Sequence, residues 1–214
     1  MKKGDFLWLA VLAACVFYIV SPMTNAMFIA QTTAHPYIGG FVKFAILSTM
    51  GELMAIRLVG GDWKKPAGLV WRVVIWGLIG MLITLMFKLF AFGVAASISG
   101  GFLPGGDSKL AFAFFTSVLI NVFFAPVFMA MHKITDSYLD LKFRDGISSP
   151  SYDAVLREAD WMTFAKFILV KTIPFFWIPA HTITFLMPGE YRIVIAAFLS
   201  IALGGILAFA KSKK

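Results

Sequence analysis

A few ionisable side chains interrupt the long apolar segments of this sequence, and they are the first residues to consider for chemistry. Glu52 is the sole acidic residue inside any such segment, and Lys171 is the base farthest from a segment end, with Lys88 at intermediate depth. Ionisable groups are costly in lipid and by default indicate a functional site. An unpaired carboxylate there would be protonated or would need a basic partner, so we expect Glu52 to pair with Lys88 or Lys171. Such a pair would either fix helix packing or line a path for a solute, and both interpretations stay open.

The other lysines within the apolar segments lie closer to the ends. Lys43 and Lys166 are about six and four residues from an end, near enough for the side chain to carry its amine to the interface. Lys171 is about nine residues inside, roughly 13 Å at 1.5 Å per residue. Extension to the interface explains Lys171 less well.

Uncharged polar residues and helix-shaping residues share faces with these charges. Gly77, Gly80, Thr84 and Lys88 fall on one side of a helix, a pattern that lets helices approach closely. The candidates for pore or interior polar positions are Glu52, Thr84, Lys88, Asn121, Lys171, Trp177, His181 and Thr184. The candidates for close helix packing are Gly51, Gly77 and Gly80. The candidates for helix kinks are Pro126, Pro174 and Pro179, because proline lacks the amide that would bond the carbonyl one turn earlier.

No residue pattern points to catalysis. The three histidines, His35, His132 and His181, are far apart in the sequence, and HExxH, G-x-S-x-G and a glycine-rich phosphate loop are all missing. Cys15 is the single cysteine, which excludes an intramolecular disulfide and a Cys/His metal site. We therefore expect no enzyme activity, no metal site and no cofactor.

The elements that must position these residues are long apolar helices. Hydrophobic residues make up 60% of the 214 positions and charged residues 14%, well below the usual share in soluble domains. A helix needs about 20 apolar residues to cross the hydrocarbon layer, and candidate segments cover 6–29, 37–59, 69–97, 109–131, 162–187 and 191–210. Strand-like alternation is missing, so a barrel is excluded. The predicted fold is an all-α, polytopic transmembrane bundle of about six spans.

The connections divide the chain into two parts. Residues 1–34 are expected to be an additional N-terminal transmembrane segment, a retained signal anchor, and residues 35–214 the main bundle. The one long connection, 132–161, is predicted to be a surface loop, with a short amphipathic piece at 154–159 that lies on the membrane or is simply solvated.

Basic residues favour one side of the membrane. With the amino terminus inside, the inner side collects Lys2, Lys3, Arg57, Lys64, Lys65, Arg72, Lys133, Lys142, Arg144, Arg157, Lys211, Lys213 and Lys214. The outer side has Lys109 and Arg192. Loops rich in Lys and Arg stay cytoplasmic, so we expect both termini on the cytoplasmic or matrix side of a bacterial inner or organelle membrane. The scattered charges do not form a nucleic-acid-binding patch.

Several ordered motifs resemble a known family. His35-Pro36-Tyr37 is similar to its His-Pro-aromatic motif, Gly51-Glu52 to its Gly-Asp, Asn121 with Phe124-Ala125-Pro126 to its Asp-Gln and Phe-Ala-Pro, and Trp177, His181 and Thr184 to its Trp-x3-Gln-x2-Asn. From about residue 35 onward the chain thus resembles the peroxisomal membrane protein 22 kDa family, relatives of the mitochondrial Mpv-seventeen protein. Met81 replaces the family's proline and Thr84 its histidine, which identifies a distant member.

The resemblance implies a small channel-like membrane protein. Lys43, Lys88, Lys166 and Lys171 outnumber Glu52 within the spans, so we expect a pore for small solutes with a preference for anions. The alternatives are a non-conducting structural or accessory membrane protein and a lipid-modifying membrane enzyme. Membrane lipids and small solutes are the expected partners, a homo-oligomer stays open, and nucleic acid is excluded.

Overall fold

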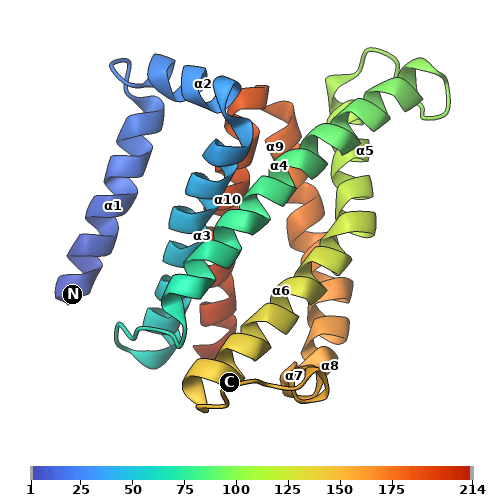
Figure 1. The fold of residues 1–214 in the computed structure, drawn as a ribbon. Helices are drawn as coiled ribbons and strands as arrows, with labels where there is room; N and C mark the ends of the chain where they lie inside the picture. Colours follow the sequence, from blue (N-terminus) through green and yellow to red (C-terminus); the bar gives the residue numbers. More distant parts are fainter. Residues whose placement is uncertain (1, 213–214) are drawn as a thin grey trace.

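The computed structural model describes residues 2–212, with residues 207 and 209–212 described by their backbone alone. Long helices pack side by side in this part of the chain (Figure 1), and residues 2–212 contain no strand. The predicted all-α, polytopic transmembrane bundle is confirmed, since five helices are long and apolar enough to cross a membrane.

These five spans differ widely in length. They are α1 (Lys3–Val20), α4 (Leu69–Ser99), the continuous helix Lys109–Arg144, the helix Trp161–Leu186, and α10 (Gly189–Ser212), whose spanning part is Gly189–Ile206. A further helix, α3 (Pro36–Gly60), has 25 residues, about 37 Å of length, but carries Lys43, Glu52 and Arg57. It lies between α4 and α10, which brings the bundle to the expected number of about six long segments.

The first segment is shorter than the predicted 6–29. Helix α1 ends at Val20, a turn covers Ser21 to Thr24, and α2 (Asn25–Ala34) then crosses one end of the bundle at a steep angle to α1. Pro22 explains the break, because proline disfavours a helical conformation in the residue before it. His35 separates α2 from α3.

The predicted surface loop 132–161 is largely wrong. The span predicted at 109–131 continues through α5 (Lys109–Leu119), the π-helical turn η1 (Ile120–Phe124), α6 (Ala125–Leu139) and a second π-helical turn, η2 (Asp140–Arg144). Residues 132–144 contain several ionisable residues, and these end the apolar run that precedes them. Four of them, however, recur at every fourth position: His132, Asp136, Asp140 and Arg144. That spacing places them on one helix face.

The true connection is shorter and contains the predicted helical piece. Helix α7 (Tyr152–Glu158) begins after Ser151, whose hydroxyl accepts a hydrogen bond from the Ala154 amide. The next span begins at α8 (Trp161–Thr163), where Asp160 accepts a hydrogen bond from the Thr163 amide at 2.9 Å. Hydrogen bonding to Thr163 also lowers the pKa of Asp160.

Prolines coincide with changes of helix type. Pro126 and Pro179 stand in the first turns of α6 and α9 (Ile178–Leu186), and Pro174 lies inside the π-helix η3 (Phe164–Trp177). The Ile178 carbonyl, next to Pro179, accepts hydrogen bonds from the Ser117 and Thr182 hydroxyls, both within 2.8 Å. The Ser117 hydroxyl thus connects the fourth span to the backbone of the fifth, and a side-chain donor of this kind satisfies a backbone carbonyl inside a membrane protein.

Close backbone contacts hold α3 against both neighbours. A Cβ on Gly51 would lie 2.7 Å from the Ser200 carbonyl oxygen of α10, and a Cβ on Gly204 would lie 2.7 Å from the Gly51 oxygen. Gly40 meets the Gly80 carbonyl of α4 in the same way. The Phe41 ring packs on Gly77, so the predicted packing glycines all lie at helix contacts.

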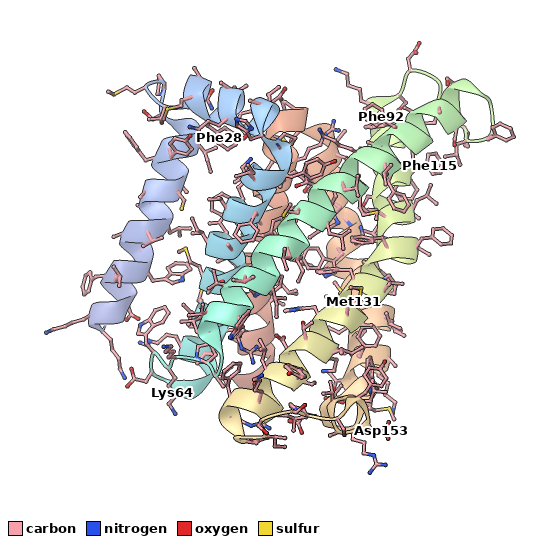
Figure 2. The ribbon with its side chains drawn as sticks, in the orientation of Figure 1. Phe28, Lys64, Phe92, Phe115, Met131 and Asp153 are labelled. Carbon is pink, nitrogen blue, oxygen red and sulfur yellow. The ribbon has the colours of Figure 1, made fainter. Side chains whose placement is uncertain are left out.

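The two ends of the bundle differ in their elements. We call them the α2 end, which holds α2 and the 100–108 connection, and the α7 end, which holds α7 and the 61–68 connection. Phe28 and Phe92 lie toward the α2 end, and Lys64 and Asp153 at the α7 end (Figure 2). Helix α1 begins and α10 ends at the α7 end.

Gly51→Ala is expected to destabilise the protein by about 1–3 kcal/mol, because the new methyl group meets backbone atoms that cannot rotate away. The matched control is Gly60→Ala on the same helix, where no neighbouring atom lies within 4 Å. Thermal unfolding in detergent should show a lower Tm for Gly51→Ala alone. Equal Tm values for the two variants would contradict the close α3–α10 contact.

Candidate functional site

A buried arginine gathers three carboxylates at the α7 end. Arg72, in the first turn of α4, is 6% exposed. Its Nη1 lies 3.1 Å from Glu52 Oε1 and 2.9 Å from Asp136 Oδ1, and its Nη2 lies 2.7 Å from Asp140 Oδ1. We call these four residues the Arg72 cluster. The carboxylates come from α3 and from the continuous helix that contains α6 and η2, so one guanidinium connects two other helices to α4.

Two aromatic rings cover one side of the Arg72 cluster. Trp76 donates a hydrogen bond to Glu52 Oε2 at 3.3 Å, and its ring lies 4.2 Å from the His132 ring. His132 Nε2 is 3.5 Å from Asp136 Oδ2. These contacts hold the carboxylates and exclude solvent from one side, which strengthens charge interactions.

Arg144 continues the network toward solvent. It contacts Asp140 at 3.6 Å, Asp145 at 2.7 Å and Glu158 of α7 at 2.9 Å. Hydrogen bonds from Arg144 keep the pKa of Asp145 below its usual value. The charged residues predicted to lie in a loop therefore connect the end of one span to the start of the next.

The predicted partners of Glu52 are wrong. Glu52 pairs with Arg72 and Trp76, whereas Lys171 and Lys88 are exposed side chains away from it. Lys171 does not share the bundle interior with Glu52, Asn121 and His181. Because Lys171 is exposed on η3, extension of its amine along the protein surface accounts for it.

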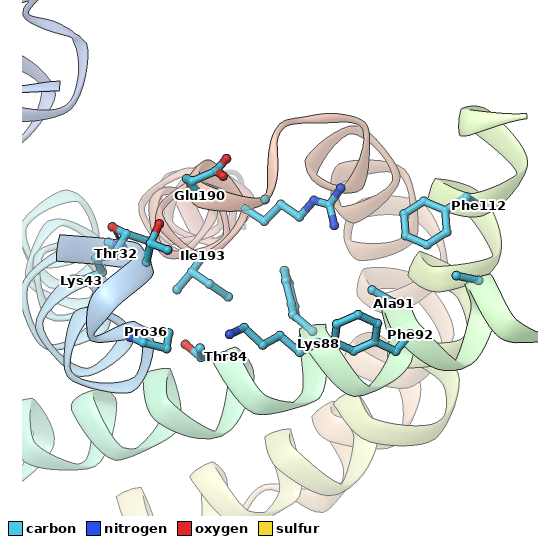
Figure 3. A pocket seen from close by; sticks show the side chains of 15 residues that line it. Thr32, Pro36, Lys43, Thr84, Lys88, Ala91, Phe92, Phe112, Glu190 and Ile193 are labelled. Carbon is cyan, nitrogen blue, oxygen red and sulfur yellow. Dashed lines mark hydrogen bonds between the residues drawn. The ribbon is translucent and has the colours of Figure 1, made fainter. Parts of the chain in front are cut away.

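Basic side chains meet instead in a cavity of about 400 Å³ near the α2 end (Figure 3). We call it the α2-end cavity. Lys43 of α3, Lys88 of α4 and Arg192 of α10 line it, together with one acidic residue, Glu190. Glu190 lies on the opposite side of the cavity from Lys88 (Figure 3). Three bases against one acid make the cavity suited to an anion.

Two of these bases already have partners. Lys43 donates a hydrogen bond to Thr32 Oγ1 at 2.7 Å and lies 4.8 Å from the Phe28 ring centre. Arg192 donates to the Met187 carbonyl at 3.0 Å and lies 5.5 Å from the Phe185 ring centre. Within residues 2–212, Lys88 has neither a hydrogen-bond nor an ion-pair partner, so its amine can receive a ligand.

The predicted interior residues of the fifth span meet the fourth span beneath this cavity. Asn121 is 1% exposed, and its amide donates to the Ser117 carbonyl at 2.8 Å and lies 3.0 Å from His181 Nδ1. The Trp177 ring lies 5.1 Å from the His181 ring, and its buried Nε1 finds no acceptor in the described part of the chain. Asn121, Trp177 and His181 therefore form one group, which brings together three of the predicted interior candidates.

Phe87 lies between this group and the cavity. Its ring lines the α2-end cavity and lies 5.3 Å from the His181 ring. Thr84 also lines the cavity, but its hydroxyl already donates to the Gly80 carbonyl at 2.8 Å. Thr184 is fully buried and donates to the Ala180 carbonyl. Both threonines satisfy their hydroxyls within their own helices, so neither needs a ligand.

Sequence reasoning missed Arg72 and its partners on α6 and η2. By its position near the end of a predicted span, Arg72 is expected to be a charge at the membrane interface. Asp136 and Asp140 follow an apolar run, so they are expected to lie in the surface loop 132–161. The signal that could have found them is the spacing of His132, Asp136, Asp140 and Arg144. Within the described chain no group of three His, Cys, Asp or Glu side chains could hold a metal ion.

No family model matches this chain, and no curated protein or solved structure is significantly similar to it. The resemblance to the peroxisomal membrane protein 22 kDa family stays a prediction from its ordered motifs.

Arg72→Met is expected to lower the free energy of unfolding by about 3 kcal/mol, because three clustered carboxylates lose the cation they share. Arg72→Lys should recover part of the loss, since an ammonium keeps the charge but not the planar fork. Chemical or thermal unfolding in detergent measures both.

Two controls separate this effect from the general loss of a surface charge. Arg157→Met removes an exposed arginine of α7, and Lys171→Met removes the exposed lysine of η3. Both should change stability by less than about 0.5 kcal/mol. If Arg72→Met were as stable as these controls, the Arg72 cluster would not hold the helices together.

Proposed function

We propose that the protein forms or contributes to a membrane pore for small solutes and that it prefers anions. The carrying observation is the α2-end cavity, where Lys43, Lys88 and Arg192 from three different helices surround one space. Opposite unit charges 4 Å apart attract by about 1 kcal/mol where water solvates them, as it does the exposed Lys88. An anion is therefore favoured over a cation or a neutral solute of equal size.

The group beneath the cavity supports the same proposal. Asn121, Trp177 and His181 carry N–H groups inside the bundle, and the Trp177 donor has no acceptor within residues 2–212. Selectivity in membrane pores depends on such lining donors and on aromatic constrictions. Phe87, between the cavity and His181, is the proposed constriction.

We further propose that the α7 end faces the cytoplasm or matrix, in a bacterial inner membrane or an organelle membrane. Lys64 and Lys65 follow α3, and Lys133, Lys142 and Arg144 lie in α6 and η2 toward the same end. The α2 end would then face the opposite compartment. Lys213 and Lys214 of the charge bias lie outside the described residues.

Lys88→Met is expected to reduce anion flux about fivefold in liposomes that contain the purified protein, because it removes about 1 kcal/mol of attraction at a solvated site. Chloride or nitrate entry, followed with an anion-sensitive dye, gives the rate. The matched control is Lys171→Met, which removes an exposed lysine from a different span and should leave the flux unchanged. Wild-type liposomes that pass anions no faster than empty ones would rule out the pore.

Reporter fusions test the proposed orientation. A reporter at residue 214 should give the cytoplasmic signal, and one inserted at 100–106 should give the opposite signal, because α10 ends at the α7 end and that connection lies at the α2 end. The same signal from both positions would contradict the spanning arrangement.

A further inference from the structure

The wall of the α2-end cavity is mainly apolar. Phe87, Ala91, Phe92 and Ala95 of α4 line it at helical spacing, and Phe112 of α5 faces them from the far side. Figure 3 shows Lys88 lying along this wall next to Phe92, with its amine toward Thr84. Charge and apolar surface are thus side by side within one space.

A fully hydrated inorganic ion matches only part of this lining. The lysine amine suits an anionic oxygen, but the aromatic and alanine wall gains stability only when it covers apolar groups. Ligand sites of about 300–1,000 Å³ typically combine an apolar lining with a few polar groups that orient the ligand. The α2-end cavity, at about 400 Å³, falls in that range.

We infer that the α2-end cavity binds an anionic amphiphile, a molecule with a carboxylate or phosphate group on a short apolar body. Lys88 holds the anionic group and the Phe92–Phe112 side of the cavity covers the apolar body. For the proposed pore, this amphiphile is the class of solute that would be transported, and that part of the inference rests on the proposed function. The binding of the amphiphile to the cavity does not depend on transport.

The partners of the three bases identify the main contact of the anionic group. Lys43 uses one N–H group on Thr32 and Arg192 uses its Nε on the Met187 carbonyl, whereas Lys88 uses none within residues 2–212. Lys88 therefore binds an anion without giving up a contact, and the remaining N–H groups of the other two bases add to the positive charge around it.

Such an amphiphile has two sources, the aqueous solution and the bilayer itself. Phe92 is 74% exposed and belongs to a membrane-spanning helix, so the cavity wall continues to the outside of the bundle. A lipid with an anionic headgroup presents the same chemistry as a free carboxylate. A competition experiment between an anionic lipid and a free carboxylate distinguishes the two sources.

The experiment measures binding to the full-length protein in phosphatidylcholine nanodiscs by isothermal titration calorimetry. The probes are octanoate, acetate and octanol, which separate the contributions of tail and charge. Octanoate should bind at least about tenfold more tightly than acetate, since each additional buried methylene adds affinity. It should bind about fivefold more tightly than octanol, since octanol has the same tail but lacks the charge that Lys88 attracts. Lys88→Met should weaken octanoate binding about fivefold or more, whereas Lys171→Met should leave it unchanged and so corrects for partition into the lipid.

A second titration uses nanodiscs that contain phosphatidylglycerol. Loss of octanoate binding in these nanodiscs means that phosphatidylglycerol occupies the site, which assigns the amphiphile site to a bilayer lipid. Unchanged octanoate binding assigns the site to an amphiphile from the aqueous solution. Equal affinities for acetate and octanoate, or octanoate binding that Lys88→Met does not change, would overturn the inference. Chloride flux through liposomes separates the two proposals. Normal chloride flux together with equal binding of octanoate and acetate overturns only the amphiphile site. Absent chloride flux together with intact octanoate binding overturns only the pore.

Discussion

Charge compensation of Arg72 is the constraint that shapes the α7 end of this protein. A guanidinium at 6% exposure is stable only if acceptors surround it, and here Glu52 from one helix and Asp136 and Asp140 from another supply them. Asp136 and Asp140 can reach it because the chain stays helical as far as Arg144. The length of that helix and the position of the arginine therefore depend on each other.

Helix α3 brings the acidic partner to this cluster because it is held in register on both sides. Gly40 and Gly51 fix it against α4 and α10, and the Ser48 and Ser200 hydroxyls meet at 3.0 Å across the second contact. Glu52 follows Gly51 directly, so the close contact with α10 also sets the height of the carboxylate. Backbone packing and charge pairing reinforce each other along one helix.

The sequence was sufficient for the class of fold and for some of the interior residues. The length of each apolar run identifies a membrane helix, and three of the polar candidates, Asn121, Trp177 and His181, lie together in the bundle. It failed for residues 132–144, because a hydropathy argument ends a helix where charges begin, although Arg72 compensates the charges of Asp136 and Asp140. It also failed for the partner of Glu52, because a charge's depth along one helix does not show which helix faces it. Lys88 and Lys171 look alike in sequence, yet Lys88 lines a cavity and Lys171 does not.

Helix α4 has a mechanical consequence for the membrane around it. Its 31 residues extend about 46 Å, while the hydrocarbon layer is about 30 Å thick. A bilayer accommodates such hydrophobic mismatch by tilting the helix or by thickening next to it. The same helix carries Lys88 and the apolar wall of the α2-end cavity, whose opposite side belongs to α10. A change in bilayer thickness therefore acts on the tilt of the helix that carries one wall of this cavity.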